Sequence, residues 1–181
     1  MCRLKRDLIL IVSVMTFNVF VVDAQTLPAG AGLTVPADVE QVIFVKRFTY
    51  NSNHYYTEFI NSKWMPGGNL SVLDVKSGQV RDLVPAMAAG VFERYDLSFD
   101  AKRVVFAWKK GPQEGYRIYE VGIDGSGLRQ LTFPQADESE LAGKYRVDPG
   151  YPHGTDDLCP CYLPDGGVVF VSTRCQYGIL C

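Results

Sequence analysis

Two segments of the chain follow the same pattern of apolar and polar positions. Residues 97–107 and 161–171 each predict a short apolar strand, a tight turn that carries an aspartate, and a β-branched strand around a phenylalanine. Repetition of such a unit is typical of arrays of similar sheets. Further β-prone segments precede the first copy and lie between the two, so the pattern predicts an all-β chain.

The expected strands and turns recur in one order. Strands are expected at 41–46, 70–75, 79–84, 96–99, 103–108, 116–121 and 127–132, and a third round starts at 157. Turns rich in Gly, Asp and Ser separate the last two strands of a round. The order within a round is strand, Asp turn, strand, loop, strand, Gly turn, strand. This is a four-stranded antiparallel meander, the unit of a β-propeller blade.

Phe44, Phe106 and Phe170 fall at corresponding positions when the rounds are aligned. Their spacing exceeds the roughly 40 to 45 residues of one blade, and the surplus corresponds to insertions at 51–68 and 133–156. The charge pattern of residues 134–146, acidic early and basic late, favours a short surface helix. Residues 41–181 are thus predicted to form about two and a half blades of an incomplete β-propeller, with a generic antiparallel sandwich as the alternative.

The N-terminal 24 residues have the pattern of a secretory signal peptide. Basic residues at positions 3, 5 and 6 precede a mostly apolar run, and small residues follow it before Gln25. An uncleaved anchor is the alternative, but the run is short for a bilayer span and contains polar side chains. We therefore expect a periplasmic or secreted chain that starts at Gln25, has a linker over 25–40 and keeps no membrane span.

Composition and charge narrow the class of partner. The 181 residues are 47% hydrophobic and carry a formal net charge of −2. This length is enough to bury one core. The charge balance gives no electrostatic footprint for nucleic acid or an anionic membrane surface. The expected ligand is therefore a protein, a glycan or a small molecule, bound through the loops at 51–68 and 133–158.

Two sets of motifs resemble known families. TolB-like and WD40-like β-propeller repeats are similar to Pro160-Cys-Tyr-Leu-Pro-Asp-Gly-Gly-Val-Val-Phe170, Ile118-Tyr119, Asp124-Gly125 and Leu131-Thr132. A narrower resemblance, to the middle-domain region of hydrazine synthase alpha subunit-like proteins, rests on Phe44-Val-Lys-Arg-Phe48, Trp64-Met-Pro-Gly-Gly-Asn-Leu70, Gln113-Glu-Gly-Tyr-Arg-Ile-Tyr119, His153-Gly-Thr-Asp-Asp157 and Ser172-Thr-Arg-Cys-Gln-Tyr-Gly178. The resemblance implies an exported β-propeller protein, and it covers most of the mature chain.

The resemblance does not imply hydrazine synthesis, because relatives need not share that chemistry. Hydrazine synthase is a multi-haem enzyme, and covalent haem attachment needs a Cys-x-x-Cys-His motif. Cys159 and Cys161 have a different spacing and no histidine follows them. We therefore expect no haem on this chain and a binding or scaffold module with no catalytic site. The alternative is the propeller portion of a periplasmic c-type-haem oxidoreductase whose haem segments lie beyond residue 181.

Residues 153–161 bring imidazole, carboxylate and thiol groups together. Alternate residues of a strand share a face, so the two thiols could contribute to a zinc site whose four candidate ligands are His153, Cys159, Cys161 and Cys175. In the alternative interpretation, Asp156 and Asp157 brace the end of the sheet and the cysteines are buried or disulfide-bonded. Export favours disulfides, and the competing pairs are Cys175–Cys181 and Cys161–Cys175.

The first insertion is dense in aromatic residues. His54, Tyr55, Tyr56 and Trp64 could line a ligand surface, with Asp156 and Asp157 as further candidates, or could pack beneath the rim of the sheets. The serines lack the Gly-x-Ser-x-Gly elbow of a nucleophile. No catalytic residue is therefore predicted.

Overall fold

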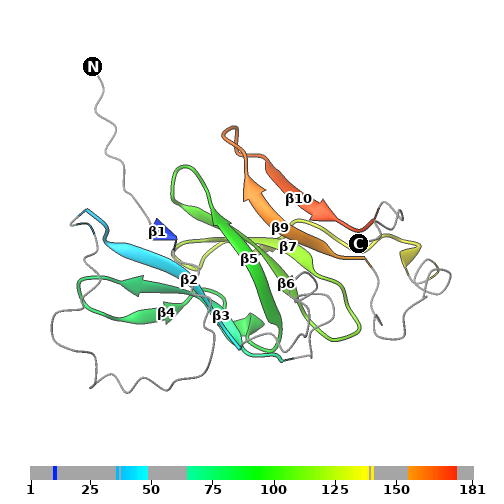
Figure 1. Ribbon diagram of the computed structural model, residues 1–181, viewed down its shortest axis with the longest axis horizontal. Coiled ribbons are helices and arrows are strands. Elements are labelled where there is room, and N and C mark those ends of the chain that lie inside the picture. Colours follow the sequence, from blue (N-terminus) through cyan, green and yellow to red (C-terminus); the bar gives the residue numbers. More distant parts are fainter. Residues whose placement is uncertain are drawn as a thin grey trace, which may run out of the picture.

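A computed structural model of the chain describes residues 10–11, 36, 38–48, 65–138, 140 and 155–174. These residues form antiparallel sheets almost throughout (Figure 1), so the all-β prediction is confirmed. Sheet A contains β2 (Gln41–Arg47), β3 (Gly68–Asp74) and β4 (Val80–Asp82), with the two-residue β1 (Leu10–Ile11) parallel to β2. Sheet B contains β5 (Val91–Leu97), β6 (Arg103–Lys109), β7 (Arg117–Gly122) and β8 (Arg129–Gln130). Sheet C contains β9 (Asp157–Tyr162) and β10 (Val168–Ser172).

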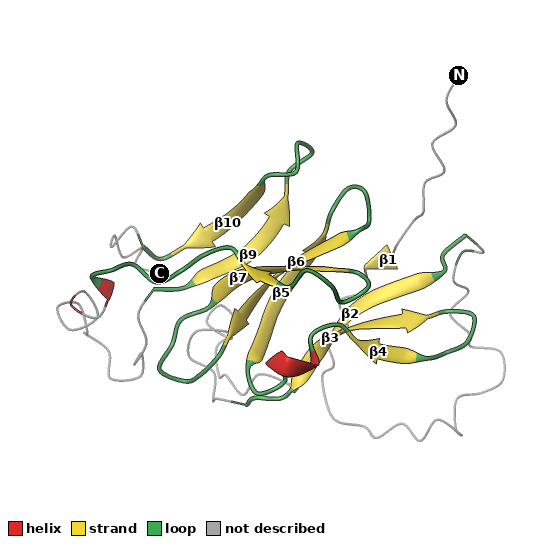
Figure 2. Cartoon of the chain, turned by 180° about the vertical axis from the view of Figure 1, so that it is seen from behind, coloured by secondary structure: helices red, strands yellow, loops and turns green. Residues whose placement is uncertain are grey.

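Within the described residues, helical structure is confined to short turns (Figure 2). The 3-10 helix η2 (Pro85–Met87) connects sheet A to sheet B and was not predicted from the sequence. The indole nitrogen of Trp108 donates to the carbonyl of Met87 at 3.0 Å, which ties this turn to β6. Of the helix predicted at 134–146, Glu138 and Glu140 are helical, and the part from 141 onward lies outside the described residues.

Sheets A and B share one register. Phe44 of β2 lies opposite Ser71 of β3, and Phe106 of β6 lies opposite Tyr119 of β7. The outer strands, β4 and β8, continue the same register. Phe44 and Phe106 therefore hold the same place in their sheets, so β2, β3 and β4 correspond to β6, β7 and β8.

The two Asp turns have the same local geometry. The residue after each aspartate has a positive φ, +57° at Ala101 and +87° at Gly166. Asp100 and Asp165 each accept a hydrogen bond from the backbone amide two residues on, at 3.2 and 2.9 Å. Such aspartate–amide bonds hold a tight turn without help from distant residues, which is why the sequence pattern located both turns correctly.

Two apolar clusters lie between successive sheets. The first cluster lies between sheets A and B and consists of Ile43, Leu70, Val72, Leu83, Val84, Met87, Phe92, Val104, Phe106, Trp108 and Val121. The second cluster lies between sheets B and C and consists of Val91, Val105, Ala107, Tyr116, Ile118, Leu158 and Tyr162. Successive residues of β6 alternate between the two clusters, as side chains in a strand do. Sheet B is therefore apolar on both faces, because a sheet covers each of them.

The first strand of each later sheet crosses the sheet before it. β5 contacts β2 and β3, and β9 contacts β5, β6 and β7. Hydrogen bonds also join β5 to β2. The Tyr95 hydroxyl donates to the carbonyl of Ile43 at 2.9 Å, and Arg47 donates to the carbonyl of Glu93 at 2.8 Å. The sheets therefore stack face to face in chain order.

The outer strands are shorter and more exposed than the pattern predicts. Residues 79–84 predict a half-buried strand, but all three residues of β4 are exposed. The buried side chains are Leu83 and Val84, which lie in the bend after the strand and belong to the first cluster. β8 likewise covers only two residues of the range predicted at 127–132.

Apart from β1, the predicted signal peptide and most of the predicted linker lie outside the described residues. In the part of the chain that the structure describes, no helix has the length and apolar character needed to cross a membrane.

Candidate functional site

The two insertions leave the sheets at the same end. In an antiparallel meander, the connection from the second to the third strand and the connection to the next sheet lie at one end. The β2–β3 and β8–β9 connections are of these two kinds, and they contain the insertions at 51–68 and 133–156. We call this the insertion end. The Asp turns of β5–β6 and β9–β10 lie at the other end (the upper side of Figure 1).

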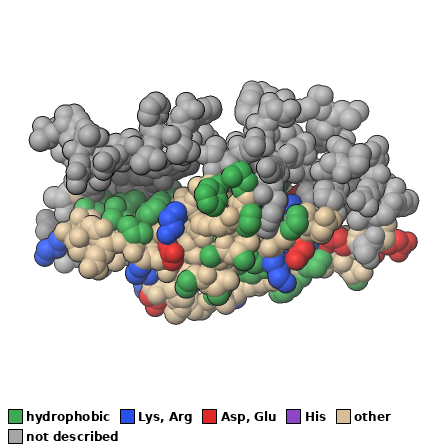
Figure 3. Space-filling view, turned by 90° about the horizontal axis from the view of Figure 1, so that it is seen from below, with side chains coloured by type: hydrophobic (Ala, Val, Ile, Leu, Met, Phe, Trp, Pro, Cys, Tyr) green, Lys and Arg blue, Asp and Glu red, His purple; other side chains and the backbone are tan. Residues whose placement is uncertain are grey.

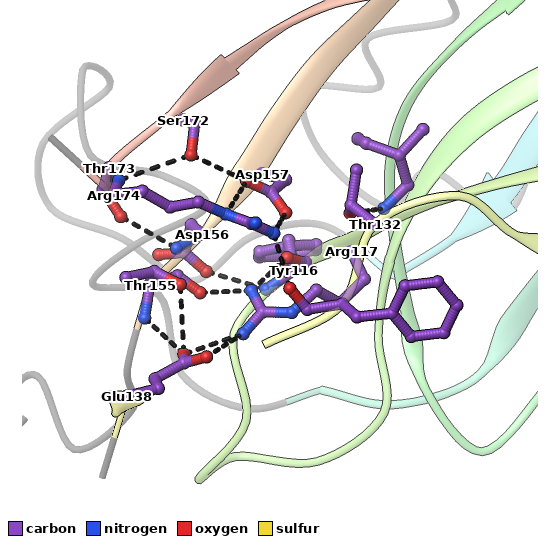
Figure 4. A network of polar contacts seen from close by, with 12 residues as sticks. Tyr116, Arg117, Thr132, Glu138, Thr155, Asp156, Asp157, Ser172, Thr173 and Arg174 are labelled. Atoms are coloured by element: carbon purple, nitrogen blue, oxygen red, sulfur yellow. Dashed lines mark hydrogen bonds and ion pairs between the residues drawn. The ribbon is translucent and has the colours of Figure 1, made fainter. Parts of the chain in front are cut away.

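Arg117, at the start of β7, is the centre of a polar network at the insertion end (Figure 4). Its Nη2 lies 2.7 Å from both carboxylate oxygens of Glu138, and its Nη1 donates to the carbonyls of Tyr116 and Thr155. Glu138 also accepts the Thr155 amide at 2.6 Å. The two charged side chains are only 8% and 13% exposed. This ion pair therefore fixes the start of β9 to the segment that follows β8.

Asp156 and Asp157 are fully buried bridges between strands. Asp156 Oδ1 accepts the backbone amide of Tyr116 at 2.8 Å, and the Asp157 amide donates to the Tyr116 carbonyl at 3.0 Å. The Asp157 carboxylate accepts the Ser172 hydroxyl at 2.7 Å and pairs with Arg174. Both aspartates therefore join β9 to its neighbours, and neither carboxylate faces solvent.

Lys109 and Tyr116 form a second contact at this end. The Lys109 Nζ lies 5.6 Å from the centre of the Tyr116 ring, within the range of a cation–π interaction. Burial lowers the pKa of Lys109, and the charge of Asp156 opposes that shift. Burial also raises the pKa of Tyr116, and the carboxylates of Glu93 and Asp156 add to it. The tyrosine therefore remains a neutral phenol at ordinary pH.

Gly115 allows the close approach on which the Arg117 network depends. A Cβ atom at this position would lie 1.8 Å from the carbonyl oxygen of Thr155, the same carbonyl that Arg117 binds. Any other residue would force β7 and the start of β9 apart. The glycine is therefore required by packing.

Two phenylalanines are exposed where the insertions begin. Phe48 follows β2 and Phe133 follows β8, and each side chain is 58% exposed. Figure 3, seen from the lower side of Figure 1, shows apolar side chains beside charges of both signs on that face of the described chain. Exposed aromatic side chains next to a rigid framework are typical of binding surfaces.

The two described cysteines are free thiols in different surroundings. Cys159 has a φ of +51°, and its thiol lies 3.4 Å from Glu93 Oε1. Burial raises the pKa of the Cys159 thiol to about 11, and Glu93 adds to the shift. Cys161 is exposed, and its bond to Asp96 raises the pKa of its thiol. The positive φ interrupts the alternation from which a shared face was predicted.

The other predicted site residues lie outside the described residues; they are His54, Tyr55, Tyr56, Trp64, His153, Cys175 and Cys181. The aromatic ligand surface, the zinc site and the disulfide therefore stay predictions. Among the residues that the structure describes, no group of three His, Cys, Asp or Glu side chains is placed to hold a metal ion.

Sequence reasoning missed Arg117, Glu138 and Glu93. The first two are distant in sequence, and no local pattern indicates that they pair. Glu93 carried a usable signal, because a carboxylate within an apolar strand must find a partner when the strand is buried. The strand was predicted only at 96–99, so Glu93 was not placed in it.

Comparison with known proteins gives a distant structural similarity. Hydrazine synthase from Kuenenia stuttgartiensis matches with 27% sequence identity and a TM-score of 0.39. The match covers 51% of this chain and 12% of that chain, so the chain spans a small part of that protein's length. No protein-family model and no curated protein matches the chain. A similarity this low does not carry the activity of that protein to this chain.

Proposed function

We propose that the chain is part of an exported β-propeller that acts as a binding or scaffold module, with its insertion end facing the ligand. One observation carries this proposal. Arg117, Glu138 and Asp156 at the insertion end bond to backbone groups or to one another, while Phe48 and Phe133 stay exposed at the same end. These charged groups hold the strand ends, and the side chains left exposed at this end include the two aromatic rings as well as the charged Lys110 and Glu114. Such a site supports binding rather than catalysis.

The stacking of the sheets supports the propeller part of the proposal. Strands β2–β4 and β5–β8 form antiparallel meanders and β9–β10 form a hairpin, and β5 and β9 each cross the preceding sheet. Neighbouring blades of a propeller pack in this face-to-face order. A two-layer sandwich would instead place consecutive strands in opposite sheets or end after two layers, whereas sheet B has a sheet on both faces.

The exposed aromatics favour a ligand with apolar faces, such as a glycan or an apolar peptide. Aromatic rings contribute to binding through buried area and stacking. The four aromatic and imidazole side chains predicted for this surface, His54, Tyr55, Tyr56 and Trp64, belong to the insertion that begins after Phe48. They would extend the same surface.

Selection against defined libraries tests the binding role. The purified chain is screened on a glycan array and against a displayed peptide library, and enriched ligands are resynthesised and titrated. The double variant Phe48→Ala/Phe133→Ala should bind these ligands about tenfold or more weakly than the parent chain. Phe99→Ala is the matched control, because Phe99 is 72% exposed at the opposite end. No enrichment, or an equal loss with the control, would contradict the proposal.

Export is tested separately. The full chain, expressed in a Gram-negative host, should be recovered from the periplasm or medium with Gln25 as its first residue. Recovery of the chain in the cytoplasm with residues 1–24 attached would contradict this part.

A further inference from the structure

One face of sheet C is apolar and exposed. Val169 and Val171 flank Phe170 in β10, and they are 51% and 59% exposed. Phe170 and Val168 point the other way and pack against the second cluster. We call the surface formed by Val169 and Val171 the open face. β10 is therefore apolar on both sides, as β6 is, but the described residues cover only one of them.

The preceding sheets show what covers the corresponding position. In sheet B, Val105 and Ala107 flank Phe106, and both are fully buried against Leu158 and Tyr162 of β9. In sheet A, Ile43 and Val45 flank Phe44 and lie in or against the first cluster, which includes Phe92 of β5. In both cases the covering element is the first strand of the following sheet.

The covering strand is also held through its backbone. Glu93 and Asp96 of β5 accept the amides of Cys159 and Tyr162 in β9, at 3.0 and 2.8 Å. The contact thus combines apolar burial with capture of backbone groups. An extended strand offers such free amides, whereas a helix uses its own amides internally.

We propose that the open face binds the first strand of a further antiparallel sheet of the same repeat. The occupant is an extended segment that is apolar at alternate positions, and it crosses β10 as β5 crosses β2 and as β9 crosses β6. This contact would continue an interface that the molecule already forms twice. It rests on the stacking proposed above and is independent of what the insertion end binds.

A peptide with the sequence of residues 90–99 is the probe, because β5 is a first strand that the chain already uses in this way. Amide and methyl NMR signals of the full chain are followed while the peptide is added up to about 1 mM. We expect saturable shifts centred on Val169, Phe170 and Val171. The variant Val169→Lys/Val171→Lys should weaken binding by about tenfold or more while the signals of Val105 stay native.

Val80→Lys is the matched control, because Val80 is 51% exposed in β4, far from this face in the sheet order. Binding that this control leaves unchanged supports the proposal. An absence of saturable shifts, shifts confined to other strands, or shifts that the double lysine variant leaves intact would overturn it. A concentration-dependent dimer that the double variant abolishes would also overturn it, because the occupant would then be a second copy. Loss of the insertion-end ligand is measured separately, so the two proposals can fail independently.

Discussion

Glu93 of β5 accepts a hydrogen bond from the backbone amide of Cys159 in β9, with 3.0 Å between the nitrogen and Oε2. The register between β9 and β10 shifts opposite Val169 and Val171, and Cys159 is left out of the paired residues. A carboxylate from the preceding sheet therefore satisfies an amide at the point where β9 departs from regular pairing. The positive φ of Cys159 marks the same irregularity.

Substitution Glu93→Ala should destabilise the fold by about 1–3 kcal/mol, because it leaves a part-buried amide without its acceptor. Urea unfolding measures this change. Glu40→Ala, which removes an exposed carboxylate, should change the free energy of unfolding by less than about 0.5 kcal/mol. Equal effects of the two variants would show that the Glu93–Cys159 bond does not contribute.

Gly115→Ala should cost more than about 2 kcal/mol, because the new Cβ atom would collide with the Thr155 carbonyl. Gly111→Ala is the control, since its nearest contact, with the Glu114 carboxylate, is an ordinary 3.5 Å. Thermal unfolding compares the two variants with the parent chain. Similar melting temperatures for both variants would refute the close approach of β7 and β9.

The two Asp turns should respond in opposite directions to exchange of alanine and glycine. Ala101→Gly relieves a left-handed conformation that disfavours any side chain, and Gly166→Ala introduces it. The entropy of the unfolded chain offsets part of each effect. We expect a gain of about 0.5 kcal/mol for the first and a loss of similar size for the second. A Cβ atom at Gly166 meets nothing within 4 Å, so the loss of stability expected for Gly166→Ala comes from the backbone conformation and not from a clash.

Cys159 should resist alkylation in the folded protein. With a pKa raised to about 11, it is almost entirely protonated near pH 8.5. Iodoacetamide should label it about a hundredfold more slowly than in urea, where its pKa returns to the ordinary range. Cys161 is exposed and should be labelled first. Mass spectrometry of the labelled peptides measures both rates, and equal labelling of the two thiols would refute the contact between Cys159 and Glu93.

Acid should weaken the fold partly through Glu120. Burial raises the pKa of this carboxyl, but hydrogen bonds from Tyr162 and Arg129 outweigh it and leave the pKa below its ordinary value of 4.5. A lowered folded-state pKa contributes stability above the unfolded value, and this is lost as pH falls through the folded value. The melting temperature of Glu120→Gln should therefore fall less between about pH 6 and about pH 3 than that of the parent. Parallel curves would contradict this role.

The inner strands and the turns could be predicted because their signals are local. Asp100, Asp165 and Gly125 appear in turns whose geometry needs an Asx acceptor or a positive φ. β5 was predicted too short, because Glu93 and Arg94 interrupt its apolar pattern. Glu93 is accommodated in the strand because it binds Cys159 of β9, and Arg94 because its side chain is exposed to solvent.

The candidate site could be predicted by residue type but not by contact. Asp156 and Asp157 stood out in the sequence, yet their partners Tyr116 and Arg174 lie just before β7 and just after β10. The ion pair between Arg117 and Glu138 exists because β7 and the segment after β8 return to the same end. No pattern within either segment encodes that meeting.

Alternation and turn chemistry act over a few residues, so the amino-acid sequence alone predicts that this chain is all-β, where its tight turns fall, and which residues repeat. Which face of each sheet is covered follows from the packing of the sheets on one another and could not be predicted from the sequence. The same holds for the bonds of Asp156 and Glu93 to backbone amides, and for the pairing of Asp157 with Ser172 and Arg174. Those outcomes depend on stacking, which joins residues far apart in the chain and leaves Val169 and Val171 as the face without a described cover.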